Sequence, residues 1–294
     1  MKKLINCPIC GQKEFENYKT CKDYTVSHEE FTIVNCKECN FKFTNPIPDL
    51  DTLADYYKSE DYISHSDTTK GLISKLYHLV RTRTLTQKVK LINSLVARGT
   101  ILDYGCGTGM FLSECKKDKW KTIGIEPDNG ARGLATKHQL KVFESKEELA
   151  KQPQLETFNV ITLWHVLEHV VDLRSTIDFL KDSLVKNGYI IIAVPNYKSF
   201  DAEAYDKHWA AYDLPRHLYH FDKATITRLM SDRGFSLTEC KPMLFDSFYV
   251  SMLSEKYKNG KSNLIGAFLR GFKSNLKAFN SKEYSSVIYI FKKQ

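Results

Sequence analysis

The amino-acid sequence predicts an α/β protein with a doubly wound, mostly parallel β-sheet. From residue 100 onward, short apolar runs alternate with amphipathic segments, which is the pattern of consecutive βα units. A glycine-rich turn, Asp103-Tyr-Gly-Cys-Gly-Thr-Gly109, directly follows the first apolar run. Such a turn lets a strand pass abruptly into a helix and lets a ligand approach the backbone closely.

The elements follow from periodicity and from the residues that begin and end them. Strands are expected at residues 100–104, 122–126, 141–143, 158–163 and 188–194. Helices are expected at residues 110–118, 129–138, 146–151 and 172–186, with further helix over 71–97 before the first strand. A short helix is also expected from Asp49 to Tyr57, because an aspartate at its start can serve as N-cap.

The glycine-rich turn and a later acidic residue together indicate a nucleotide site. Gly105, Gly107 and Gly109 alternate along the turn, and the N–H groups at the start of the next helix would face a ligand. Glu126 lies 19 residues after Gly107, at the tip of the second predicted strand. A carboxylate there can accept both hydroxyls of a ribose.

The pattern Asp103-x-Gly-x-Gly-x-Gly differs from the G-x-G-x-x-G of dinucleotide sites and resembles motif I of the class I S-adenosylmethionine (SAM) dependent methyltransferases. The resemblance implies a Rossmann-like, seven-stranded sheet whose last strand is antiparallel, and residues 286–291 supply a candidate. It also implies that Asp103 holds the amino group of SAM and Glu126 the ribose. The other residues expected around the cofactor are Tyr104, Gly105, Cys106, Gly107 and Pro127. A tight βα turn in an unrelated α/β fold is the alternative.

The fourth predicted strand runs directly into Trp164-His-Val-Leu-Glu-His169. Ligands of open α/β sheets bind beyond the carboxyl ends of the strands, so Trp164 and His165 are expected beside the cofactor. The segment is similar to one common among small-molecule methyltransferases. It is unlike the Asn/Asp-Pro-Pro-aromatic motif of many base and amide N-methyltransferases, which argues against DNA adenine as acceptor. Glu168 and His169 are expected to brace the next helix.

Residues 199–222 contain many aromatic and ionisable side chains just after the fifth strand, where a substrate loop is expected. Arg216-His-Leu-Tyr-His-Phe221 resembles the His-x-x-x-Phe segment of the sugar C-methyltransferase and ubiquinone-type O-methyltransferase branches. In the sugar C-methyltransferases that histidine lies at the active site. The match makes His217 the candidate catalytic base, with a substrate-binding or structural role as the alternative.

Four of the eight cysteines form two pairs, Cys7-x-x-Cys10 and Cys36-x-x-Cys39. Two such pairs separated by a loop are typical of a tetrahedral four-thiolate zinc site. Gly11 suits the first knuckle and Asn40 a left-handed position after the second, and residues 30–35 are expected to form a ribbon strand between them. Because such a site has no open position, the predicted zinc is structural. The sugar C-methyltransferase branch carries a cysteine-rich zinc module of this kind as well.

The chain of 294 residues therefore divides into a zinc-binding ribbon at 1–45, a linker and helical extension at 46–98, and a methyltransferase domain at 99–294. The sequence shows no run long enough to span a membrane and no signal-peptide core after its Met-Lys-Lys start, so a cytoplasmic protein is expected. Its net charge of +8 is concentrated in residues 241–294, which carry ten Lys and Arg against three acids.

These features favour an enzyme that methylates a small molecule, with a sugar or nucleotide-sugar of cell-surface polysaccharide biosynthesis as the acceptor class. One alternative is an RNA methyltransferase whose ribbon and basic C-terminal region grip phosphates, and another is a SAM-binding scaffold. The ribbon lacks the dense basic and aromatic surface of nucleic-acid binders, which argues against RNA. The apolar stripe of a helix at residues 264–279 is expected to pack on the domain or on a second subunit rather than on a membrane. The oligomeric state is not predicted.

Overall fold

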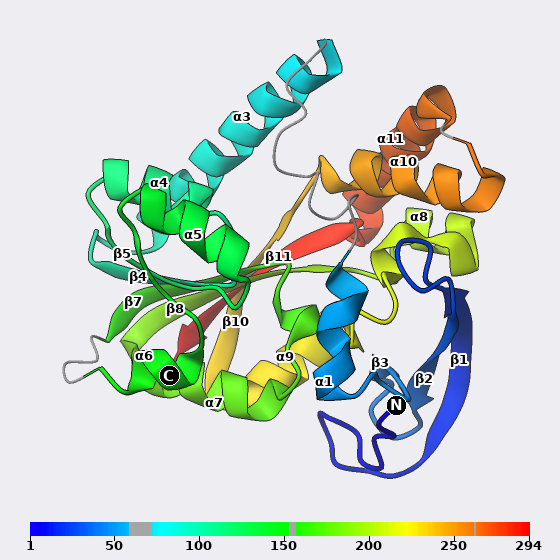
Figure 1. The fold of residues 1–294 in the computed structure, drawn as a ribbon, viewed down its shortest axis with the longest axis horizontal. Coiled ribbons are helices and arrows are strands. Elements are labelled where there is room, and N and C mark those ends of the chain that lie inside the picture. Colours follow the sequence, from blue (N-terminus) through cyan, green and yellow to red (C-terminus); the bar gives the residue numbers. More distant parts are fainter. Residues whose placement is uncertain (59–71, 153–156, 262) are drawn as a thin grey trace.

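A computed structural model of the chain describes residues 1–58, 72–152, 157–261 and 263–294. Its central sheet has seven strands in the order β10-β11-β8-β7-β4-β5-β6 (Figure 1). The five strands from β6 to β8 are parallel, whereas β11 lies antiparallel between β8 and β10. The predicted fold class is thereby confirmed. The strands are β4 (Thr100–Tyr104), β5 (Lys121–Ile125), β6 (Lys141–Phe143), β7 (Phe158–Trp164), β8 (Leu184–Pro195), β10 (Phe235–Pro242) and β11 (Ser286–Lys293).

Helices cover both faces of this sheet, each face with its own hydrophobic cluster (Figure 1). One face carries α3 (Leu72–Leu95), α4 (Met110–Lys117) and α5 (Asn129–Lys137). The other carries α6 (Lys146–Ala150), α7 (Leu173–Ser183) and α9 (Lys223–Ser231). Several of these helices begin where an aspartate side chain accepts a backbone N–H of the first turn, which satisfies one of the helix's unpaired donors. These caps are Asp128 of α5, Asp172 of α7 and Asp222 of α9.

The predicted strands and helices of the βα units all occur, with ends shifted by a few residues. Of the 46–98 extension, residues 59–71 lie outside the described part of the chain. Before that gap the chain forms α1 (Leu50–Leu53) and the 3-10 helix η1 (Ala54–Tyr57). Asp49 occupies the N-cap position of α1 but makes no side-chain capping bond there. The expected helix at 71–97 is α3.

The N-terminal residues form a second, antiparallel sheet that reaches across the predicted domain boundary. Its order is β1-β2-β3-β9, with β1 (Phe15–Lys22), β2 (Glu30–Cys36), β3 (Lys42–Thr44) and β9 (Tyr219–His220). The strand β9 comes from the predicted substrate loop and pairs with β3 through Phe43 and Tyr219. The ring of Phe41 packs on those of Phe43, Tyr219 and Phe221. One hydrophobic core therefore joins the N-terminal module to the larger domain.

The predicted substrate loop at 199–222 is folded rather than open. It contains α8 (Phe200–Tyr205), the 3-10 helices η4 (Asp206–His208) and η5 (Ala210–Tyr212), and β9. Its large aromatic side chains are buried against the N-terminal module and α10 (Asp246–Asn259). The loop serves as a scaffold, and the side chains exposed to a substrate are fewer than the sequence suggested.

The apolar stripe of α11 (Leu264–Ser281) was expected to pack on the domain or on a second subunit; the first expectation is wrong, and the second stays a prediction. The buried residues of this helix are the small ones, Ala267, Gly271, Ser274 and Ala278, and its large apolar side chains are exposed. The stripe therefore does not pack on the domain. Among the described residues, no helix is long and apolar enough to cross a membrane.

Candidate cofactor and catalytic site

The glycine-rich turn connects β4 to α4 with three left-handed residues, at Gly105, Gly107 and Gly109. The N–H groups of Gly105 and Cys106 donate to the carbonyl of Ile125, 2.8 and 2.9 Å away, which fastens the turn to the end of β5. A Cβ at Gly105 would lie 2.5 Å from Val166, so only glycine fits. At Gly107 the backbone is equally left-handed, with φ of 54°, but a Cβ would meet no atom of the described chain within 4 Å. Such open backbone is where a ligand can lie against the turn.

Glu126 lies beside this open backbone. Its carboxylate accepts the N–H of Gly107 at 2.7 Å and the N–H of Asp128 at 2.9 Å. Burial raises the pKa of Glu126, while these two backbone N–H groups favour the ionised form. Each carboxylate oxygen retains lone pairs that can accept a hydroxyl. Glu126, the residue predicted to bind the ribose, is therefore held in place by a hydrogen bond from the glycine-rich turn itself.

A buried charge cluster lies at the carboxyl ends of β4 and β7. Asp103 is buried and accepts a hydrogen bond from the Thr162 hydroxyl at 2.6 Å. The ammonium of Lys88, on α3, lies 4.0 Å from the centre of the Trp164 ring and interacts with Asp103 electrostatically. Burial raises the pKa of Asp103 and lowers the pKa of Lys88, because each charged form loses its hydration. The indole N–H of Trp164 is buried without a hydrogen-bond partner among the described residues.

His165 links the end of β7 to the start of α10. It has a left-handed φ of 57°, and its Nε2 lies 3.0 Å from Asp246 of α10. Its Nδ1 lies 3.4 Å from the carboxylate of Glu168. Burial opposes the charged imidazolium, but the two carboxylates outweigh burial and raise the pKa of His165 to about 10. His165 is therefore a cation at neutral pH and cannot serve as a base.

The structure places the remaining predicted cofactor residues around the turn in different ways. Tyr104 packs into the core under α6 and α7, and Cys106 into the core under α4. Burial raises the pKa of the Cys106 thiol, so this side chain is a small apolar group. Pro127 is exposed, and its carbonyl accepts a hydrogen bond from Arg132 at 2.9 Å. Tyr104 and Cys106 can face a ligand only through their backbone.

Sequence reasoning missed Lys88 and Asp246. Lys88 lies between Leu85 and Ile92 on the face of α3 that packs on the domain, and a lysine among buried apolar neighbours was the available signal. Asp246 comes from the C-terminal region, far along the chain from β7, and no local pattern marks it.

The candidate base His217 is buried beside His169. Its Nδ1 lies 2.9 Å from the carbonyl of Ala211, and because a carbonyl can only accept, Nδ1 carries the proton. Nε2 then has a free lone pair. Burial, together with the neighbouring His169, lowers the pKa of His217 well below its usual value, so the ring is neutral at neutral pH. This is the protonation state that a general base requires.

Three groups that can accept a proton or bind a cation meet here. The carboxylate of Glu168 and one ring nitrogen each of His169 and His217 lie within 4.8 Å of one another. The Nδ1 of His169 donates to the Arg216 carbonyl at 3.1 Å and also lies 3.0 Å from the hydroxyl of Tyr57. The buried Glu168 carboxylate accepts no well-formed hydrogen bond from the described residues, but the charged ring of His165 lies 3.4 Å from it. Carboxylate and imidazole groups gathered in this way can share a proton or hold a cation.

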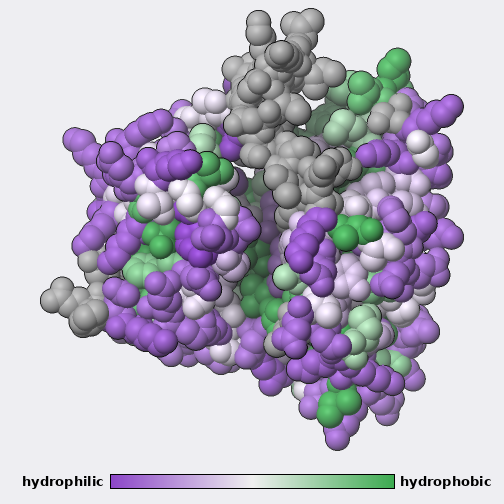
Figure 2. Space-filling model, viewed as in Figure 1, coloured by the Kyte–Doolittle hydropathy of each residue, from purple (hydrophilic) through white to green (hydrophobic). Residues whose placement is uncertain are grey.

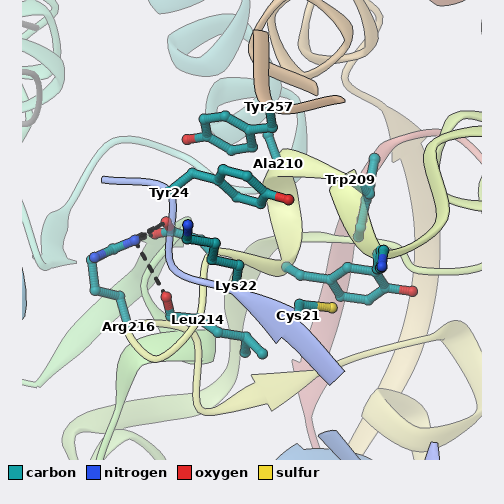
Figure 3. Close-up of a pocket in the computed structure, with 11 residues that line it drawn as sticks. Cys21, Lys22, Tyr24, Trp209, Ala210, Leu214, Arg216 and Tyr257 are labelled. Carbon is teal, nitrogen blue, oxygen red and sulfur yellow. Dashed lines mark hydrogen bonds and ion pairs between the residues drawn. The ribbon is translucent and has the colours of Figure 1, made fainter. Parts of the chain in front are cut away.

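Arg216 fastens this segment to the N-terminal module. Its buried guanidinium donates to Asp213 at 2.7 Å, to Asp23 at 3.0 Å and to the Tyr56 carbonyl at 2.9 Å. Figure 3 shows Arg216 near Leu214, beneath the stacked rings of Tyr24 and Tyr257. The space between these residues is about 10 Å³, room for one water at most. This region is a structural anchor rather than a binding site.

The four paired cysteines converge. The Sγ atoms of Cys7 and Cys39 lie 3.5 Å apart, as do those of Cys10 and Cys36, and all four lie within 4.8 Å of one another. A tetrahedral zinc with Zn–S bonds of about 2.3 Å separates its sulfurs by about 3.8 Å, so the donor set fits. These separations exclude disulfides. As predicted, Gly11 and Asn40 are left-handed.

The first knuckle is also held by the larger domain. The guanidinium of Arg174, on α7, donates to the carbonyls of Pro8 and Ile9 at 2.8 and 2.6 Å. Burial raises the pKa of Cys7 and that of Cys39, the latter to about 11, so these thiols need a cation to become thiolates. A metal at this position would stabilise the module and its contact with α7 together.

The described residues also form hollows at the surface. Figure 2 shows a cleft with apolar residues in its floor, between the side that carries α5 and the side that carries α1. A second cleft of about 400 Å³ lies between the N-terminal sheet and the loop after β8. There the ammonium of Lys42 lies between the rings of Tyr18 and Tyr197, 4.5 and 4.6 Å from their centres. Amide and carboxylate groups complete the lining, from Asn17, Asn35, Asn40, Glu16 and Asp222.

Residues 72–240 match a family model described as a methyltransferase domain. The chain is 28% identical over 159 residues to a ubiquinone biosynthesis O-methyltransferase of Azorhizobium caulinodans, covering 50% of this chain and 62% of that protein. It is 23% identical over 204 residues to the enzyme of the same description from Rickettsia typhi, covering 64% and 82%. The chain thus spans about three fifths of the length of the Azorhizobium relative.

Solved structures with the same fold include the magnesium protoporphyrin IX methyltransferase of Synechocystis with bound S-adenosylhomocysteine. The TM-score is 0.54 at 15% identity, over 84% of this chain and 100% of that one. A SAM-dependent methyltransferase from Archaeoglobus fulgidus has a TM-score of 0.50 at 18% identity, over 72% and 94%. At these identities the likeness concerns the fold.

Proposed function

The chain belongs to the methyltransferase domain family, and we propose that it transfers the methyl group of SAM, with its residues dividing the work as follows. Glu126 accepts the ribose hydroxyls, and the backbone of Gly105 and Gly107 lies against the methionine part. Asp103 faces the ammonium of the cofactor and Lys88 its carboxylate. The support is the open left-handed backbone at Gly107 beside the fixed carboxylate of Glu126.

When bound, SAM supplies a methyl group on a sulfonium sulfur. The acceptor must lose a proton as it takes that methyl group, and we assign the base to Nε2 of His217. The observation that carries this assignment is the bond from Nδ1 of His217 to the Ala211 carbonyl, which leaves Nε2 unprotonated in a neutral ring. Glu168 and His169 lie in the same cluster as His217. His165, already protonated, is a positioning residue.

The acceptor we propose is a small, hydroxyl-rich molecule of the sugar or nucleotide-sugar class. Its support is the cleft around Lys42, where amide groups, two carboxylates, two lysines and two tyrosine rings can contact hydroxyl and phosphate groups. RNA is not proposed as the acceptor, since the exposed lysines of the C-terminal region lie beside large apolar side chains rather than on a polar surface.

We also propose that Cys7, Cys10, Cys36 and Cys39 bind one structural zinc, and that residues 1–45 act as a module docked on the domain at 99–294.

The test is methyl transfer from labelled SAM to a panel of nucleotide-sugars by the wild type and His217→Asn. The asparagine amide can still donate to the Ala211 carbonyl but cannot act as a base. We expect turnover to fall by about 10²- to 10⁴-fold, the usual contribution of a general base, with SAM affinity unchanged. Undiminished turnover in the variant would remove His217 from the reaction. Transfer to RNA but to no small molecule would overturn the acceptor class.

A further inference from the structure

The outer face of α11 is an unpartnered apolar surface. Its large side chains are among the most exposed hydrophobic groups of the described chain, with Ile265 at 76%, Phe279 at 69% and Phe268 at 60%. We call this set the α11 face; its members are Leu264, Ile265, Phe268, Leu269, Phe272, Leu276 and Phe279. Figure 2 shows hydrophobic surface at the upper right, where Figure 1 places the start of this helix. Contiguous apolar surface of this kind marks an interaction site.

The orientation of α11 is fixed by the residues on its inner side. A Cβ at Gly271 would lie 2.9 Å from the backbone of Phe248 on α10, so the two helices approach closely at this point. Rotating α11 to bury its phenylalanines would place bulky side chains where Ala267, Gly271 and Ala278 now fit. The ring of Phe268 stacks on that of Phe248, with 5.3 Å between centres, and continues the apolar surface toward α10. The exposure of the face follows from the packing.

The segment that carries the α11 face has charges of one sign. Residues 256–282 contain seven Lys and Arg and no Asp or Glu. Lys273 follows Leu269 by four residues and Lys277 follows Lys273 by four, so exposed cations flank the apolar stripe along one side. The ammonium of Lys277 lies 4.1 Å from the centre of the Phe200 ring, which keeps it close to the helix surface. Long lysine side chains can extend along an apolar surface while their charges stay in the aqueous layer.

We propose that the α11 face docks on an anionic lipid bilayer, with the helix axis in the plane of the interface. An apolar stripe flanked by cations on one helix is the pattern of a peripheral membrane helix, and anionic headgroups complement the acid-free segment. A symmetric pair of copies through the same face would offer these lysines no complementary charge, because the segment that forms the face has no Asp or Glu. An anionic bilayer accommodates the apolar stripe in its hydrocarbon region and the flanking lysines at its headgroups.

The site and the α11 face share α10. Asp246, the first residue of α10, contacts His165, and the same helix packs on α11 at Phe248. Docking would therefore hold the methyltransferase site at a defined distance from the lipid surface. An acceptor anchored in the membrane could then reach it. The docking itself does not depend on the identity of the acceptor.

The experiment is sedimentation of the full chain with vesicles of phosphatidylcholine alone or with about one third phosphatidylglycerol. We expect binding to the anionic vesicles that declines with salt, and about tenfold weaker binding for the double variant Phe268→Ser, Phe272→Ser. A second double variant, Leu276→Ser with Phe279→Ser, tests the same face in case the first double variant folds poorly. Thermal melting curves show whether each variant is folded. Leu134→Ser removes an exposed leucine on α5 and should bind as the wild type does.

Absence of binding to anionic vesicles, or equal binding by all variants, would overturn the proposal. So would a concentration-dependent dimer in ultracentrifugation that both serine pairs dissociate, since the face would then belong to a second copy. SAM affinity, measured by calorimetry on the same proteins, should be unchanged in every variant. A failure of docking is therefore distinguishable from a failure of the proposed enzyme function.

Discussion

Replacing Arg216 by methionine should destabilise the whole chain, because its buried guanidinium links the N-terminal module to the larger domain. The guanidinium is 1% exposed, and the Asp23 side chain it contacts is fully buried. Burial alone would raise the pKa of Asp23 and that of Asp213, but Arg216 outweighs it and holds both below their usual range. Methionine keeps most of the side-chain volume and removes the charge.

The magnitude follows from what Arg216→Met leaves behind. Two carboxylates would remain in the interior without their cation, and removing one partner of a buried ion pair costs about 3–5 kcal/mol. By contrast, Lys117→Met removes an exposed pair with Glu114 and should cost less than about 1 kcal/mol. Adding Asp23→Asn to Arg216→Met should recover part of the loss, because one uncompensated charge then disappears.

Urea unfolding at pH 7, followed by circular dichroism and by tryptophan fluorescence, measures these differences. We expect one cooperative transition in each protein, since a single hydrophobic core crosses from the module into the domain. Arg216→Met within about 1 kcal/mol of the wild type would refute the reasoning about the buried pair. A separate early transition of the N-terminal module would refute the shared core.

Three further predictions concern the site and the module. Lys88→Met should weaken SAM binding about 10- to 100-fold in calorimetry, the size of one charge-assisted hydrogen bond, and unchanged affinity would place Lys88 outside the cofactor site. Protein purified without chelator should hold one zinc per chain by elemental analysis, lost together with thermal stability in Cys36→Ser; metal-free wild type of equal stability would contradict this. Burial lowers the pKa of His220 to about 3. Below about pH 6.5 the unfolded chain therefore binds a proton on this residue, whereas the native chain does not. Stability should therefore fall by about 2 kcal/mol from this residue between pH 7 and pH 5, and His220→Asn should show a correspondingly shallower loss.

The parts of the fold that can be predicted from the sequence are those set by local residue patterns. The turn at Gly105 and Gly107, the strand ends around it and the knuckles at Gly11 and Asn40 depend on residues within a few positions of one another. Glu126 could be placed because strand and helix lengths in a βα unit fix the distance to the next strand tip. Such local rules also identified the family.

The features of the fold and of the site that cannot be predicted from the sequence depend on contacts between distant segments of the chain. The pairing of β3 with β9 joins residues 43 and 219, and no periodicity announces it. Helical spacing correctly predicted an amphipathic α11 but not which side faces the domain, since Gly271 and Ala267 pack closely where phenylalanine cannot. The place of the loop, the chemistry of histidine and the resemblance together predict His217, but the carbonyl of Ala211 that sets its tautomer is visible only in three dimensions.

Titration of SAM into the wild type and Glu126→Ala by calorimetry tests the cofactor site most directly. The carboxylate is already held by the N–H groups of Gly107 and Asp128, so it needs no reorganisation to accept the ribose hydroxyls. We predict one SAM per wild-type chain and a loss of about 1–3 kcal/mol of binding free energy in the variant. Glu114→Ala, on the exposed side of α4, is the matched control and should bind as the wild type does. Equal affinity of Glu126→Ala and wild type would contradict the placement of SAM against this turn.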